Sequence, residues 1–285
     1  MNGFVAAFRN EVFVGLRSLG TRFVILTPVL LVAVQLVLAK LTESTAAARD
    51  NLLGSDRFND LVAEPAYGNL VDGLNTGLIL LGLLLVAQSA FSFSADRDSG
   101  ALRHLIIRRC SRSAVVLAKF AYLLLMAVVA LSLLLLASYF LSGMLWEYGP
   151  VVEDGFELIS EAEIRTELLL GLRLAILPLP AAIGLGLCFS IAANSATQAV
   201  IAALGVTLAL DMFKGMMGDS ADYIYARFMP SLLNESYLSD VGRLVRGYSD
   251  VLIDERFIQF NYWVPLPSLL LLLVAGLVLV RRKKI

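Results

Sequence analysis

The sequence predicts an all-α integral membrane protein with six transmembrane helices and with both termini in the cytoplasm. Of its 285 residues, 58% are hydrophobic and only 16% are charged, whereas soluble domains contain roughly 45–50% apolar and about 25% charged residues. The apolar residues form runs that reach, or nearly reach, the roughly 20 helical residues that cross a bilayer. Basic residues gather between alternate runs, which sets the orientation.

The six spans are predicted to be helical because a lipid-exposed backbone must satisfy its own hydrogen bonds, and the alternation typical of barrel strands is absent. Pro178 and Pro180 should kink the fourth span. We predict one transmembrane domain over residues 1–285. Its spans are expected at about 23–39, 74–93, 114–143, 168–192, 196–210 and 263–280, and its outer segments at 40–73, 144–167 and 211–262.

The charge distribution orients the spans. The segments assigned to the cytoplasm, residues 1–22, 94–113 and 281–285, contain 12 Lys or Arg and 3 Asp or Glu. The outer segments contain 9 basic and 21 acidic residues. Because basic residues near span ends stay on the cytoplasmic side, both termini are predicted to lie there.

The N-terminal lead has the pattern of an amphipathic helix. Phe4, Phe8, Val12 and Leu16 recur at every fourth position, so their side chains share one face of a helix. Such a helix within residues 1–22 would lie in the membrane interface with its apolar side toward the lipid. The alternative is a cytosolic lead that only extends the first span.

A secretory signal peptide is the competing interpretation of the first 48 residues, because the apolar run is followed by three alanines at 46–48. The charged lead is long for a signal peptide, and the cleavage site would lie well beyond Lys40 and Glu43. We therefore favour a retained first span.

The reactive residue types form no catalytic or metal site. The single histidine, His104, cannot build a histidine-based site alone. Cys110 and Cys188 are far apart and in no CxxC pair. The acidic residues near 153–163 fit a solvated surface better than a metal site, and the net charge of -1 suggests no nucleic-acid partner. A membrane-embedded enzyme is therefore disfavoured.

The connection after the second span contains the most informative pattern. Asp96 and Asp98 end the span, Gly100 allows a backbone break, and Ser111 is placed to cap the third span. Between them, Leu102, Leu105 and Ile106 share one face of a short helix, with Arg103 beside it. This helix is too small to fold alone and needs a partner for its apolar face. The alternative is a basic loop that fixes topology and contacts lipid headgroups.

This connection resembles that of the permease subunits of type-2 ABC exporters, the ABC-2 family. Those permeases have an acidic residue, a Gly-Thr pair and a Leu-rich turn after the second span, then a Ser-Arg pair and a lysine entering the third. Asp96, Ser99-Gly100-Ala101-Leu102, Leu105, Ser111-Arg112 and Lys119 follow that order. Ala101 replaces the usual threonine, and Arg109-Cys110 replaces a turn that commonly contains proline, so the detailed loop geometry is the weaker part of the match.

The resemblance implies a permease subunit in the cell membrane, the inner or plasma membrane, acting as a homodimer or heterodimer. The loop would be a coupling helix that docks on a cytosolic ABC ATPase. No G-x-x-x-x-G-K-[ST] motif occurs, so ATP and Mg²⁺ are expected on that partner and no cofactor on this chain. The residues that the resemblance assigns to coupling are Asp96, Asp98, Gly100, Leu102, Arg103, Leu105, Ile106 and Arg112.

Arg173 stands inside the outer part of the fourth span. It is expected to extend its side chain to the headgroups, although a second interpretation places it on the substrate path. An ion-coupled carrier or channel is the alternative function, but carriers usually place several ionisable residues at mid-membrane. A membrane anchor for a cytosolic partner is a further alternative. Nothing in the sequence selects a substrate.

Overall fold

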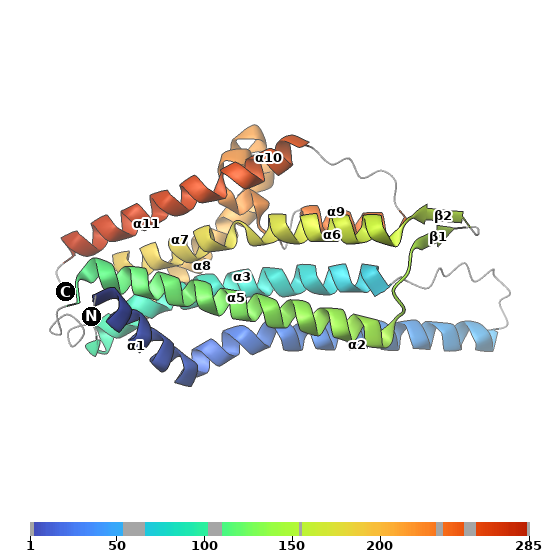
Figure 1. Cartoon of the computed structure of the whole chain (residues 1–285), viewed down its shortest axis with the longest axis horizontal. Helices are drawn as coiled ribbons and strands as arrows, with labels where there is room; N and C mark the ends of the chain where they lie inside the picture. The colour runs from blue at the N-terminus through green and yellow to red at the C-terminus, as the bar shows by residue number, and fades with distance from the viewer. Residues whose placement is uncertain are drawn as a thin grey trace.

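The computed structural model describes residues 3–53, 66–101, 110–153, 156–231, 236–247 and 255–283. Long helices run side by side, and both chain termini lie at the same end of the bundle (Figure 1). We call this end the terminal end and the opposite one the distal end. The elements are α1 (Gly3–Arg17), α2 (Leu19–Leu53), α3 (Ala66–Asp98), α5 (Arg112–Leu145), β1 (Val151–Glu153), β2 (Phe156–Ile159), α6 (Glu161–Ile176), α7 (Leu179–Ala192), α8 (Ala196–Phe213), η1 (Lys214–Met216), η2 (Gly218–Tyr223), η3 (Tyr225–Phe228), α9 (Tyr237–Val245), α10 (Glu255–Trp263) and α11 (Pro265–Arg282).

Among the described residues, six helices, or pairs of consecutive helices, are long and apolar enough to cross a membrane. This number agrees with the predicted number of spans and with a multi-pass membrane protein. The fourth crossing consists of α6 and α7, and the sixth of α10 and α11. Because both termini lie at one end, the number of crossings is even, as the charge pattern requires. The cytoplasmic location of that end stays a prediction.

Helix α3 lies at the centre of the bundle and contacts α2, α5, α7, α8 and α9. Its buried face includes Leu74, Leu81 and Leu85, which lie within the main hydrophobic core. The closest approach of α3 is to α7, because Gly186 has no side chain where α7 meets α3. A Cβ atom at Gly186 would lie 2.7 Å from the carbonyl oxygen of Val86.

Helix α1 packs along the terminal half of α5 through its small residues. Ala7 and Gly15 are buried, and a Cβ atom at Gly15 would overlap the ring of Tyr122 in α5. Phe4, Val5, Phe13 and Leu16 are exposed, whereas Phe8 and Val12 of the predicted apolar face pack against the main hydrophobic core. The interfacial position of α1 stays a prediction.

The helices continue beyond the predicted spans at the distal end (Figure 1). α2 runs to Leu53, α3 begins at Ala66 and α6 begins at Glu161, so much of the first two outer segments is helical. Between α5 and α6, β1 and β2 form an antiparallel pair that the sequence did not predict. Hydrogen bonds tie these helix ends together, including Tyr67 Oη to Glu161 Oε1 at 2.8 Å and Ser142 Oγ to the Ala66 carbonyl at 2.7 Å.

Two described parts of the third outer segment, residues 211–231 and 236–247, pack on the bundle. η1, η2 and η3 follow α8 directly, and Tyr225 and Phe228 are buried there. α9 packs on α3 and α6 through Leu238, Val241 and Val245. The spacing of these three residues places their side chains on one face of α9.

Candidate functional site

The sequence-predicted coupling residues divide into two groups. Leu102, Arg103, Leu105 and Ile106 lie outside the described residues. Asp96, Asp98, Gly100 and Arg112 are described, and all four lie at the terminal end, where α3 ends and α5 begins.

Asp96 belongs to a group of three charged side chains from three helices. Lys119 of α5 lies 2.9 Å from Glu11 Oε1 of α1, and it also pairs with the carboxylate of Asp96 in α3. The Lys119 side chain is only 2% exposed and that of Glu11 is 11% exposed. Burial raises the pKa of the Glu11 carboxyl, and Lys119 offsets part of this increase. We call Glu11, Asp96 and Lys119 the charged triad.

The triad adds a residue to the predicted set. Asp96 was predicted from the resemblance as a coupling residue, and in the structure it pairs with the buried Lys119 of α5. Glu11 was not among the predicted site residues. Nothing local in the sequence marks Glu11 for this role, because its partner Lys119 lies 108 positions away.

Arg97 and Asp98 tie the end of α3 to the short turn between α7 and α8. Arg97 Nη1 donates to the Ala193 carbonyl at 2.7 Å, and Asp98 Oδ2 accepts from the backbone N–H of Ala196 at 2.8 Å. Arg97 and Asp98 also pair with each other, at 3.3 Å. A carboxylate at the start of α8 and a guanidinium at the end of α7 both complement the helix dipoles.

The C-terminal residues complete this arrangement. Lys283 Nζ donates to the carbonyls of Ile191, Ala192 and Ala193 at the end of α7, and burial lowers the pKa of its ammonium group. Arg112 Nη1 donates to the Lys283 carbonyl at 2.9 Å. The end of α3, the α7–α8 turn, the start of α5 and the end of α11 are therefore joined by charge-assisted hydrogen bonds.

The two ends of the loop also have the expected local geometry. Gly100 has a φ of 76°, which L-residues with a Cβ atom rarely adopt. Ser111 is the N-cap of α5, and its side chain accepts a hydrogen bond from the Ala114 backbone. Both features had been expected from the sequence.

The other candidate residues lie elsewhere. Arg173 lines a pocket far from the terminal end, beside the break between α6 and α7. Cys110 and Cys188 are free thiols. Within the described part of the chain, no group of three or more His, Cys, Asp or Glu residues is arranged to hold a metal ion.

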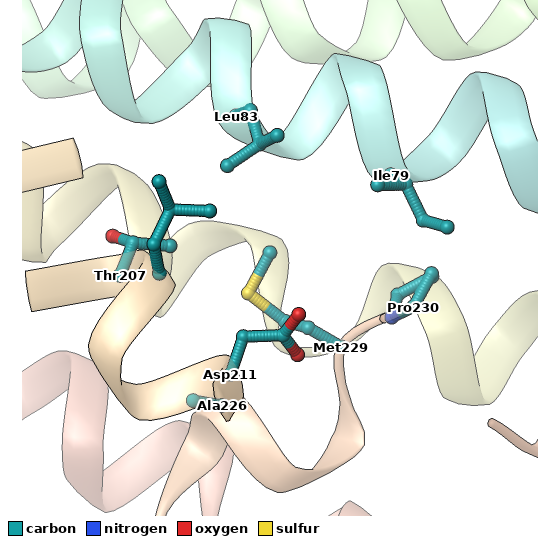
Figure 2. Close-up of a pocket in the computed structure, with 8 residues that line it drawn as sticks. Ile79, Leu83, Thr207, Asp211, Ala226, Met229 and Pro230 are labelled. Carbon is teal, nitrogen blue, oxygen red and sulfur yellow. The ribbon is translucent and has the colours of Figure 1, made fainter. Parts of the chain in front are cut away.

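A small cavity between α3, α8 and the segment after η3 contains one carboxylate (Figure 2). Its volume is about 30 Å³, enough for one or two water molecules. Asp211 lines it and also pairs with Lys214 at 2.8 Å and with Ser231 Oγ at 2.7 Å. A cavity of this size holds no larger substrate.

A comparison with known protein families identifies the family of this chain. The model of a family described as ABC-2 family transporter protein matches residues 5–281, almost the whole chain. The chain belongs to the ABC-2 transporter family. No curated protein and no solved structure matches it.

Membership of the ABC-2 family makes the chain a membrane component of a transporter, and such components are generally not catalytic themselves. The family in general works with an ABC ATPase. In this ABC-2 protein, charge-assisted contacts join four elements at the terminal end of the bundle, beside the loop that the resemblance assigns to coupling.

Proposed function

We propose that the chain is the permease subunit of an ATP-binding cassette transporter and moves a substrate across the membrane with ATP hydrolysed by a separate subunit. The family match over residues 5–281 carries this proposal. The sequence contains no Walker phosphate-binding motif, so ATP and Mg²⁺ would be held by the partner and no cofactor by this chain. The whole chain would act as one transmembrane domain in the cell membrane.

The terminal end fits the role of the coupling side. Asp96, Arg97 and Asp98 stand directly before the predicted coupling helix. Asp96 contacts Lys119 of α5, and the other two contact the α7–α8 turn. A force on the loop would therefore reach α1, α5 and the α7–α8 turn together. One permease and one ATPase make half a transporter in this family, so we infer a dimer of such halves.

The docking role of the loop predicts the effect of Leu105→Asp. If Leu105 faces the ATPase, the substitution places a charge in an apolar contact, which costs far more than losing the contact itself. We expect the ATPase to be lost from complexes purified in mild detergent, while the isolated permease shows no ATP hydrolysis with or without the change.

The matched control is Ser99→Asp, which adds the same charge at an exposed position at the start of the loop. It should leave ATPase recovery unchanged at equal membrane levels. Full recovery and full transport with Leu105→Asp would show that this loop is not the docking element. ATP turnover by the pure chain would refute the separate ATPase.

The topology predicts which positions react with an impermeant thiol reagent. In a chain without Cys110 and Cys188, single cysteines at positions 55, 155 and 235 should be labelled in intact cells. A cysteine at position 104 should be labelled only after permeabilisation, because the basic segments stay on the cytoplasmic side. Labelling of position 155 only after permeabilisation would contradict the six-span orientation.

A further inference from the structure

Two broken helices form a pocket on the flank of the bundle. The break between α6 and α7 and the break between α10 and α11 lie at the same level along the bundle (Figure 1). The pocket has a volume of about 460 Å³. Arg173, Tyr262 and Leu266 at its rim are exposed, so it opens to the surroundings of the protein. It is lined by Arg173, Ile176, Leu177, Pro180, Tyr262, Pro265, Leu266 and Leu269.

A proline and an asparagine explain the break between α6 and α7. Pro178 has no N–H, so the Leu174 carbonyl lacks its intrahelical donor. Asn261 of α10 replaces that donor, with its Nδ2 atom 3.0 Å from the Leu174 oxygen. Asn261 is fully buried. This hydrogen bond fastens one broken helix to the other and keeps the pocket between them.

The pocket has positive charge without a counterion. Arg173 is the only charged residue among the described residues that line it, and no ion pair joins it to another described residue. α7 and α11 both begin here. Their first turns offer few free donors, because four of their residues are prolines and the amides of Ala181 and Ser268 already donate to backbone carbonyls. The guanidinium of Arg173 is therefore the group that favours an anionic ligand.

The depth of the pocket indicates where that ligand comes from. At 1.5 Å per residue, the stretch from Arg173 to Ala192 is about 28 Å long, and that from Pro265 to Arg282 about 26 Å. The hydrocarbon core of a bilayer is about 30 Å thick. The pocket thus lies at the distal boundary of the hydrocarbon, where Tyr262 and Trp263 are exposed as in an interfacial aromatic belt.

We propose that this pocket binds the headgroup phosphate of an anionic phospholipid from the distal leaflet. The planar guanidinium of Arg173 binds two phosphate oxygens at once. An acyl chain of the same lipid lies along Ile176, Leu266 and Leu269, apolar side chains that a small dissolved anion has no group to contact. The site is separate from the coupling end, and its occupation requires no ATPase.

The test measures lipid selectivity at the pocket in the full-length chain. Trp146→Phe leaves Trp263, the neighbour of Tyr262, as the only tryptophan. In phosphatidylcholine vesicles, brominated phosphatidylglycerol and brominated phosphatidylcholine are compared as quenchers of its fluorescence at equal mole fractions. We expect about a tenfold preference for phosphatidylglycerol, because both lipids carry the phosphate but only phosphatidylcholine brings a cation, its choline group, beside Arg173.

Arg173→Gln should reduce the preference to near one, and Arg173→Lys should keep part of it. Arg281→Gln is the matched control, because it removes the same charge from an exposed residue at the other end of α11. It should leave the preference intact. Equal thermal stability of Arg173→Gln and the parent shows that the fold is unchanged.

Three results would overturn the proposal: no preference in the parent chain, the same preference in Arg173→Gln, or loss of the preference in millimolar inorganic phosphate. The last result would identify a site for free phosphate, because an acyl chain in the pocket should protect a bound lipid from displacement.

Discussion

Lys119→Met is expected to lower the free energy of unfolding by about 3–5 kcal/mol, the usual cost of removing one partner from a buried ion pair. The methionine leaves Glu11 and Asp96 facing each other with no cation between them. Helix α1 should then separate from α5, because the ion pair between Glu11 and Lys119 joins these two helices. For a chain of this size the melting temperature should fall by about 10 °C, measured by thermal unfolding in detergent.

Glu11→Gln is the matched control for this prediction. It keeps the pair between Asp96 and Lys119, and it removes a carboxyl whose pKa is raised by burial. Its cost should be about 1 kcal/mol. Adding Glu11→Gln and Asp96→Asn to Lys119→Met should recover most of the lost stability, since no buried charge then remains. A Lys119→Met chain as stable as the parent would show that the triad contributes nothing.

Gly186→Ala should separate α3 from α7 and lower stability by about 1–3 kcal/mol, the usual cost of overpacking. The new methyl carbon would lie 1.8 Å from Ser89 Oγ and 2.7 Å from the Val86 carbonyl oxygen. The serine can turn away, but the carbonyl belongs to the α3 backbone, so the helices must move apart. Thermal unfolding in detergent should show a fall in melting temperature of about 5 °C.

Gly205→Ala provides the comparison, because it makes the same chemical change where no atom lies within 4 Å of the added carbon. In the interior of α8 it should be neutral or stabilise by up to about 1 kcal/mol. Ser89→Ala combined with Gly186→Ala should recover only part of the loss, since the backbone contact remains. Equal melting temperatures for the two glycine variants would contradict the close packing of α3 and α7.

The sequence predicted the number of spans, the break at Pro178 and the cap at Ser111, because each depends on local chemistry. Continuous apolar runs need no tertiary information to be recognised, and proline removes a donor wherever it stands. The lengths of the helices were not predicted. Hydropathy marks where a helix is apolar, whereas α2 continues through a polar stretch to Leu53.

The sequence also could not predict which residues pair with Glu11, Asp96 and Arg97. Glu11 and Lys119 are 108 positions apart, and Arg97 contacts a carbonyl 96 positions away. Nothing local indicates such pairs. The pocket beside Arg173 depends in the same way on the meeting of two broken helices, although Pro178 and the position of Arg173 were both visible.

Helix α3 can transmit a movement from one end of the bundle to the other, because it is long, central and continuous. It runs without a proline from Ala66 to Asp98, and at 1.5 Å per residue it is about 50 Å long. Its terminal end is held by Lys119 and by the α7–α8 turn, and its distal end by Glu161 and α9. A rigid tilt of about 5° around one end of such a helix moves the other end by about 4 Å. A small displacement beside Asp96 would therefore become a movement larger than a hydrogen bond on the opposite side of the bilayer.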